Sequence, residues 1–162
     1  MRIERLSLYA EDTGHCLMAF KPSRDVIMLP PGNYRLLEYQ SLRRDARGNL
    51  WRLSAAGTYD SPVVAVAPNI EALLPLGEPY MPVVDLRPAK KDTYTGKGNI
   101  PLLFNIEGAG KERVFYLTTI DNADSRGSFL KRRGIGKRPK EPTFVIVKAD
   151  GEIVAKGSFE YG

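Results

Sequence analysis

The sequence predicts an all-β fold, an antiparallel β-sandwich, on three observations. Apolar and polar residues alternate with a period of two along most of the chain, which is the pattern of half-buried strands. Turn-forming Gly, Pro, Asn and Asp separate these stretches at short intervals. No stretch has the apolar repeat of an amphipathic helix, although an average globular protein is about one third helix. We therefore expect strands joined by turns, and no helix.

The first half of the chain carries enough strand candidates for a sandwich of its own. The alternation rule predicts about eight of them before residue 88, of which segment 70–76 has signals of either kind. They cover residues 3–9, 15–20, 26–29, 34–42, 50–56, 62–67, 70–76 and 80–86. Gly48 marks the turn of a hairpin between residues 34–42 and 50–56. We expect residues 1–88 to form a β-sandwich domain.

The second half predicts a smaller β unit. Residues 89–98 are polar and contain glycine, so we interpret them as a linker. Residues 99–162 hold about four strand candidates, at 100–107, 113–120, 143–148 and 152–160, with Asp150-Gly151 as a strong hairpin turn. Four strands are marginal for an independent core, so this unit either packs on the first domain or is truncated at its end. Unpaired sheet edges near Val83 and at the C-terminal strand would favour dimerisation.

Composition limits the chemistry that the chain can carry. Of its 162 residues, 43% are hydrophobic and 27% charged, which suits a globular protein with a core. A single cysteine, Cys16, excludes an internal disulfide. No apolar run reaches the roughly 18 residues of a transmembrane helix, so we expect no membrane span. The chain stops directly after a strand: a trimmed chain would be secreted or periplasmic, and a full-length one cytoplasmic.

Positive charge is concentrated in one loop. Residues 1–88 carry ten basic and ten acidic side chains, so the net charge of +5 comes entirely from residues 89–162. Six basic residues form a basic cluster within residues 131–140: Lys131, Arg132, Arg133, Lys137, Arg138 and Lys140. Such a cluster attracts phosphates or sulfates by Coulomb attraction and counterion release. The alternative is a solvated loop that trypsin cuts readily near Arg133.

Candidates for catalysis and metal binding are few. His15 is the single histidine, and its neighbour Cys16 faces the opposite way on a strand, so the two cannot pair as base and nucleophile. We expect Cys16 to be buried and His15 exposed. The best calcium ligands follow residue 120, although their spacing differs from an EF-hand loop and a polar turn explains them better: Asp121, Asn122, Asp124 and Ser125.

Four dispersed acidic residues would support glycoside hydrolysis only if two of them met in a cleft. These residues are Glu38, Asp45, Asp60 and Glu78. The segment Gly108-Ala109-Gly110 follows a strand, but Arg113 stands where a nucleotide-binding loop has its third glycine. The segment Gly134-Ile135-Gly136 also lacks the third glycine, since Pro139 stands at that position. We therefore expect no catalytic residue, no metal site and no cofactor.

Aromatic side chains on one face of a sandwich can bind sugars. The candidates are Trp51, Tyr39, Tyr59 and Tyr80. Trp51 alternates with Arg52 in the stretch LWRLS, and buried aromatic residues dominate small cores, so we interpret Trp51 as a core residue. No carbohydrate-binding residue is predicted.

Two segments carry a family resemblance. In the stretch LPPGNY, residues 29–34, proline and glycine set a turn and Tyr34 starts a strand with its ring against the core. The stretch FVIVKADGEIVAKGSFEY, residues 144–161, is an apolar hairpin around Asp-Gly. Both resemble parts of immunoglobulin-like and prealbumin-like β-sandwich modules of bacterial secreted or cell-envelope proteins.

The resemblance implies a fold and a general role. Such modules serve as spacers, adhesion units or ligand-binding accessories of enzymes. We therefore expect a non-catalytic structural or interaction module of a larger protein, whose partner is another protein or the other domains of its parent chain. The alternative is a module that binds an acidic polymer, nucleic acid or acidic glycan, through residues 131–140.

Overall fold

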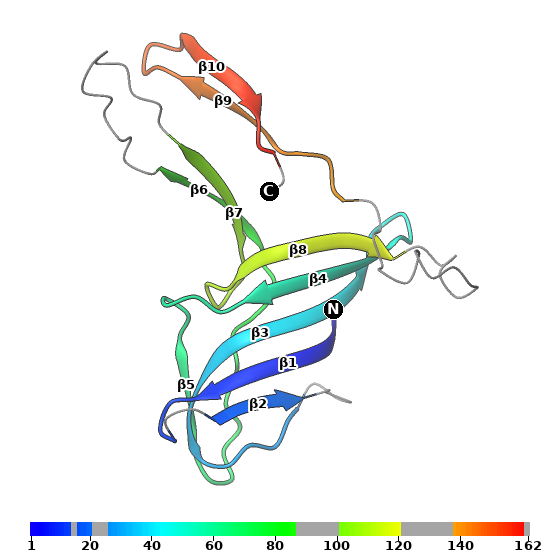
Figure 1. Cartoon of the computed structure of the whole chain (residues 1–162), viewed down its shortest axis with the longest axis vertical. Coiled ribbons are helices and arrows are strands. Elements are labelled where there is room, and N and C mark those ends of the chain that lie inside the picture. Colours follow the sequence, from blue (N-terminus) through cyan, green and yellow to red (C-terminus); the bar gives the residue numbers. More distant parts are fainter. Residues whose placement is uncertain (14–15, 21–25, 87–100, 121–137, 161–162) are drawn as a thin grey trace. The chain divides into compact units, whose positions relative to one another are not determined.

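A computed structural model describes residues 1–13, 16–20, 26–86, 101–120 and 138–160, without the side chains of residues 16–18. Over these residues all regular secondary structure is β-strand, drawn as arrows in Figure 1. The strands form a large antiparallel sheet and a small two-stranded one. The all-β prediction is confirmed for the described residues, and the face-to-face packing of a sandwich stays a prediction.

Residue contacts divide the chain into two compact units. Unit 1 comprises Met1–Met81 and Ile106–Arg138, and unit 2 comprises Pro82–Asn105 and Pro139–Gly162. The predicted linker, residues 89–98, lies outside the described residues, so the division into domains 1–88 and 99–162 stays a prediction. In the described part of the chain no helix has the length and apolar character needed to cross a membrane.

Unit 1 is built on one antiparallel sheet with the strand order β2-β1-β3-β4-β8, and β5 pairs with the first residues of β3. Its strands are β1 (Arg2–Ala10), β2 (Cys16–Phe20), β3 (Gly32–Arg44), β4 (Leu50–Ala56), β5 (Val63–Val66) and β8 (Arg113–Ile120). Each coincides with a stretch of predicted alternation. β8 lies in the predicted second unit and pairs with β4 from Leu50 to Ala56.

The core of unit 1 lies on one face of this sheet. In the register, Leu8 of β1 pairs with Leu36 of β3, and Tyr39 of β3 pairs with both Leu6 of β1 and Ala55 of β4. All five are buried. Cross-strand partners share a face, so the period-two pattern places these side chains together. Complete burial of a leucine side chain contributes roughly 1.5–3 kcal/mol.

Residues 26–29 were predicted to be a short strand, and this prediction is wrong. Ile27 and Leu29 pack against the core while Val26 and Met28 point to solvent, which produces the alternation without any strand pairing. The two prolines that follow, at 30 and 31, lack the N–H that a ladder needs. Segment 70–76 likewise forms no strand, although Leu74 and Leu76 pack on the core.

The stretch LPPGNY has the predicted local structure. Tyr34 is buried, and its hydroxyl donates a hydrogen bond of 2.8 Å to the carbonyl oxygen of Pro30. The bond ties the start of β3 to the segment before it, and the ring contributes to the core.

The β3–β4 hairpin turns at Asp45 to Asn49. Gly48 has a φ of +82°, and its N–H donates to the carbonyl oxygen of Asp45 at 3.0 Å. The Asp45 carboxylate accepts the indole N–H of Trp51 at 3.0 Å and the side-chain amide of Asn49 at 2.9 Å. These two bonds lower the pKa of Asp45 from 3.8 to about 2. Trp51 is half-buried and outside the core cluster, so its prediction as a core residue is wrong.

Unit 2 holds most of β6 (Met81–Leu86) and β7 (Leu102–Glu107), and all of β9 (Thr143–Val147) and β10 (Ile153–Ser158). β9 and β10 form the predicted hairpin. Gly151 has a φ of +91° and its N–H donates to the carbonyl oxygen of Lys148 at 3.0 Å. A glycine tolerates this positive φ at little cost, which is why Asp150-Gly151 sets the turn here.

Candidate functional sites

The basic cluster is only partly described. Four of its members lie outside the described residues: Lys131, Arg132, Arg133 and Lys137. Arg138 and Lys140 are exposed. Anion binding through this cluster therefore stays a prediction.

Neutralising the cluster tests that prediction. Replacing Lys131, Arg132 and Arg133 by glutamine removes three charges, which should weaken binding to a labelled oligonucleotide or a sulfated polysaccharide at least tenfold. The slope of log affinity against log salt should fall by roughly three for duplex DNA. A fluorescence-anisotropy salt series measures both quantities. A control variant loses three charges of residues 1–88 instead: Arg2, Arg24 and Arg47. Equal affinity of the two variants and the parent protein would reject the prediction.

The predicted calcium ligands also lie outside the described residues, as does His15, and the side chain of Cys16 is not described. Elsewhere, among the residues that the structure does describe, no group of three or more His, Cys, Asp or Glu side chains is placed to hold a metal ion.

The four acidic candidates have separate surroundings. Glu38 forms an ion pair with Arg5 on the neighbouring strand at 3.7 Å, and Glu78 forms one with Arg43. Asp45 is held in its hairpin turn, and Asp60 is exposed in another turn. The aromatic candidates also have different surroundings: Tyr39 is completely buried, whereas Tyr59 is 95% exposed. Neither set forms a common surface in the described part of the chain.

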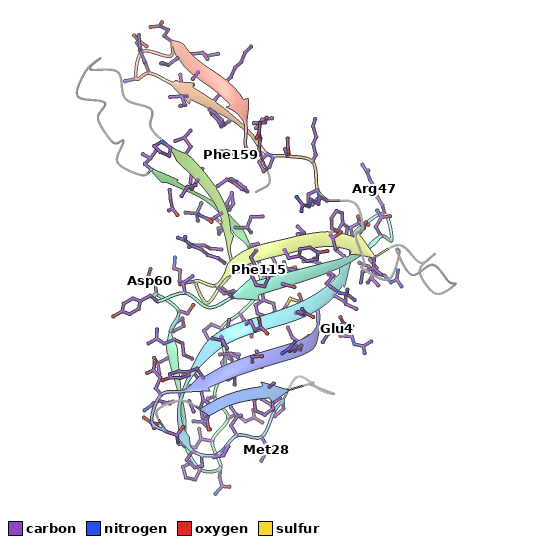
Figure 2. All side chains as sticks on the ribbon, viewed as in Figure 1. Glu4, Met28, Arg47, Asp60, Phe115 and Phe159 are labelled. Carbon is purple, nitrogen blue, oxygen red and sulfur yellow. The ribbon has the colours of Figure 1, made fainter. Side chains whose placement is uncertain are left out.

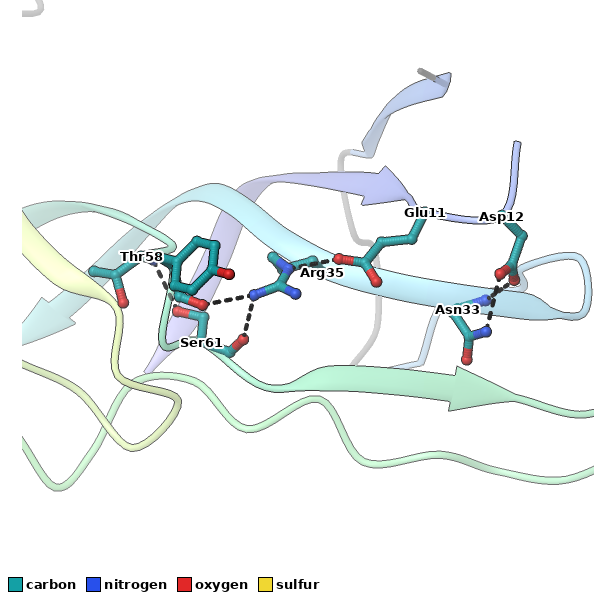
Figure 3. A network of polar contacts seen from close by, with 7 residues as sticks. Glu11, Asp12, Asn33, Arg35, Thr58 and Ser61 are labelled. Atoms are coloured by element: carbon teal, nitrogen blue, oxygen red, sulfur yellow. Dashed lines mark hydrogen bonds and ion pairs between the residues drawn. The ribbon is translucent and has the colours of Figure 1, made fainter. Parts of the chain in front are cut away.

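A polar network joins β1 and β3 to the turn before β5 (Figure 3). The guanidinium of Arg35 donates to the Glu11 carboxylate at 2.7 Å and to the carbonyl oxygens of Tyr59 and Ser61 at 2.8 and 3.0 Å. The hydroxyl oxygen of Ser61 in turn accepts the N–H of Thr58 at 2.9 Å. The guanidinium of Arg35 thus donates three hydrogen bonds to acceptors of the protein itself. We therefore interpret the network as structural.

A second pair in the same network fixes the start of β3. One carboxylate oxygen of Asp12 accepts the backbone N–H of Asn33 at 2.6 Å, and the other accepts its side-chain amide at 3.0 Å. The pair links the turn after β1 to β3 across 21 residues of sequence. The Asp12–Asn33 pair is exposed, and both oxygens of the Asp12 carboxylate accept a hydrogen bond from Asn33. These two bonds order the turn after β1.

Glu112 is a buried carboxylate that the sequence analysis did not identify. Its side chain is completely inaccessible to solvent. One carboxylate oxygen accepts the N–H of Gly77 and, at 3.1 Å, the hydroxyl of Tyr39. The other accepts the N–H of Gly110 at 2.9 Å. A buried carboxylate is costly unless it accepts several hydrogen bonds, and three donors meet that need.

Glycine makes room for this carboxylate. A Cβ at Gly108 would lie 2.0 Å from a carboxylate oxygen of Glu112, and one at Gly110 would lie 2.1 Å from the carbonyl oxygen of Pro75. The backbone N–H of Gly108 donates to the carbonyl oxygen of Glu112, and that of Ala109 to Gly77. The N–H groups of Gly108, Ala109 and Gly110 are thus all bonded within the protein.

Two tyrosines complete the Glu112 site. The hydroxyl of Tyr39, which donates to Glu112, also shares a hydrogen bond of 2.9 Å with the hydroxyl of Tyr80. Burial is the main cause that raises the pKa of both phenols above their usual value. Both therefore stay neutral donors at physiological pH. Through these hydrogen bonds the site anchors β3, the 75–80 segment and the start of β8 to one another.

The β9–β10 hairpin presents apolar side chains on a surface. Cross-strand pairing aligns Val147 with Ile153 and Val145 with Lys156, and residues two apart on a strand share a face. We call this set, Val145, Val147, Ile153 and Lys156, the outer face. Val145 is 56% exposed, Val147 52% and Ile153 61%.

The opposite face of the hairpin carries an aromatic contact. Phe144 of β9 packs on Phe159, labelled in Figure 2, with ring centroids 5.0 Å apart, and Phe159 packs on Phe104 of β7 at 5.2 Å. Gly157 allows the Phe144 ring to lie across β10, because a Cβ there would come within 3.0 Å of the ring. This aromatic cluster gives the inner face a partner within unit 2.

Comparison with family models, curated proteins and solved structures gives no match for this chain. The function is therefore argued from the residues described above.

Proposed function

We propose that this chain is a non-catalytic β-sandwich module that acts as a structural or interaction part of a larger protein, secreted or in a bacterial cell envelope. The arrangement of polar side chains supports the proposal. Arg35, Asp45 and Glu112 each direct their hydrogen bonds to the protein's own backbone and side chains. In unit 1 these groups stabilise turns and strand ends.

The observation that carries the proposal is the exposure of unit 2. Among its described residues none is buried, yet it is rich in large apolar side chains. Eight of these are exposed: Val84, Leu86, Leu103, Val145, Ile146, Val147, Ile153 and Val154. An isolated two-stranded hairpin is marginally stable in water, and exposed apolar surface of this kind marks an interaction site. Unit 2 thus has the surface of an element that another protein part covers.

Site-specific photocrosslinking in cells of the source organism tests the proposal. A photoreactive side chain at Val145 or Val147 should give one adduct with the same protein, identified by mass spectrometry, because both positions lie on the outer face. A probe at Leu73, which is 87% exposed in unit 1, is the control and should give none. The absence of adducts at the outer face, or turnover of a substrate by the purified chain, would refute the proposal.

A further inference from the structure

The face of the unit 1 sheet opposite the core, which we call the polar face, carries a row of polar side chains across four strands. In the register, Arg5 of β1 pairs with Gln40 of β3, Gln40 with Ser54 of β4, and Ser54 with Tyr116 of β8. The first three are each next to a core residue in the sequence, so alternation places the row on the opposite face. Adjacent strands lie about 4.8 Å apart, so the row is about 14 Å long.

Phe115 lies at the β8 end of this row (Figure 2). The β4–β8 register shifts so that Tyr116 pairs with Ser54 and Val114 with Ala55, which makes Phe115 the additional residue of a β-bulge. Val114 packs against the core, whereas Phe115 is 62% exposed. The bulge therefore puts a large aromatic ring on the polar face.

A second β-bulge adds an apolar side chain to the same face. The β1–β3 register shifts directly after Leu36, which is buried, so that Leu37 is the additional residue and is 43% exposed. Strand β4 lies between β3 and β8, and at this level it ends in Ala56 and Gly57, whose N–H donates to the carbonyl oxygen of Leu37. Small residues therefore separate Leu37 from Phe115.

The charges of the polar face are balanced. Arg5 lies 3.7 Å from Glu38 and Arg52 lies 3.8 Å from Glu4. Both distances are longer than a hydrogen bond, so each pair offers donors and acceptors to a ligand. A hydroxyl group both donates and accepts, and a pair of opposite charges suits it. Equal numbers of opposite charges give no attraction for a polyanion.

We propose that the polar face of unit 1 binds a neutral, hydroxyl-rich polysaccharide. A sugar ring presents C–H groups on its face, which pack on the ring of Phe115, and hydroxyl groups at its edge. Further sugar rings of the same chain lie along the row, where their hydroxyl groups bond to Gln40 and to the Arg5–Glu38 pair. All of these residues belong to unit 1, so the site is separate from the interaction surface proposed for unit 2.

Affinity electrophoresis of the whole chain tests the site, in gels that contain hydroxyethyl cellulose, galactomannan or pullulan. At least one of these neutral polysaccharides should retard the parent chain. Phe115→Ala removes the stacking ring and should weaken that binding about tenfold, whereas Phe115→Tyr keeps the ring and should bind as the parent chain does. The matched control is Tyr59→Ala, which removes a 95% exposed aromatic side chain from a turn and should change nothing.

Two further measurements identify the polar contacts and the charge of the ligand. Gln40→Ala removes one hydrogen-bonding side chain from the row and should weaken binding about threefold. Binding should be independent of salt and should persist when Lys131, Arg132 and Arg133 are replaced by glutamine, because a neutral ligand releases no counterions. Circular dichroism checks that each variant remains folded.

The inference is overturned if none of the three gels retards the parent chain, or if Phe115→Ala is retarded as strongly as the parent. Retardation by a sulfated polysaccharide alone would also overturn it, in favour of an acidic polymer. Crosslinks from Val145 and Val147 would in each case leave the interaction role of unit 2 intact, since neither residue belongs to the polar face.

Discussion

Replacing Glu112 by alanine is expected to lower the free energy of unfolding of unit 1 by about 3–5 kcal/mol. The change leaves the N–H groups of Gly77 and Gly110 and the hydroxyl of Tyr39 without their acceptor in a dry interior. Each unsatisfied buried donor costs roughly 1–3 kcal/mol, and the lost side chain also leaves a cavity. Urea denaturation followed by the fluorescence of Trp51, the single tryptophan of the chain, measures the loss in unit 1.

Glutamine at position 112 separates hydrogen bonding from volume. It keeps one acceptor oxygen for Gly77 and Tyr39 but presents an NH₂ group to the N–H of Gly110, so we expect a loss of about 1–3 kcal/mol. The matched control is Glu38→Gln in unit 1, which breaks the exposed ion pair with Arg5 and should change the free energy of unfolding by less than about 0.5 kcal/mol. If Glu112→Ala were as mild as this control, Glu112 would not be the anchor described here.

The strand positions could be predicted because their signal is local. Alternation along residues 34–42 reflects a face that is more buried than the other, and the glycines at 48 and 151 mark hairpins because each adopts a positive φ. Residues 26–29 show where this reasoning fails. Alternating burial also arises in an extended segment that lies on the core without pairing, and alternation alone does not separate the two.

The Glu112 site could not be predicted, because its members come from three distant parts of the chain. Gly77, Tyr39 and Glu112 meet only when β3, the 75–80 segment and β8 are in place. The sequence did contain one signal in the two glycines at 108 and 110. The pattern resembles part of a phosphate-binding loop, whereas in the structure the missing side chains make room for the carboxylate that follows.

The apolar hairpin was predicted as structure and not as a surface. A run such as FVIV is apolar on both faces, which is typical of a strand covered on both sides. In the structure the inner face has the aromatic contact of Phe144 with Phe159, while Val145 and Val147 remain exposed. The hairpin could therefore be predicted from its apolar run and its Asp-Gly turn, whereas the exposure of Val145 and Val147 is known only from the structure.

A second large effect is expected at Gly57, directly after β4. A Cβ at this position would lie 1.9 Å from the carbonyl oxygen of Leu36 and 2.9 Å from its carbonyl carbon. The obstacle is backbone, so no side-chain rotation relieves it, and the N–H of Gly57 is bonded to the carbonyl oxygen of Leu37 at 2.9 Å. Leu36 is itself buried in the core of unit 1. Gly57→Ala must therefore separate β3 from the end of β4, at a cost of about 3 kcal/mol or more.

Gly48→Ala is the matched control, because it makes the same chemical change where space is available. No atom lies within 4 Å of the added Cβ, and the cost comes only from the positive φ of +82°. That strain amounts to about 1–2 kcal/mol. Urea denaturation followed by Trp51 fluorescence should therefore rank Gly57→Ala well below Gly48→Ala in stability, with similar m-values if both unfold in one transition. The reverse order would mean that the close approach of Gly57 to Leu36 does not hold β3 and β4 together, and that backbone conformation outweighs packing at both glycines.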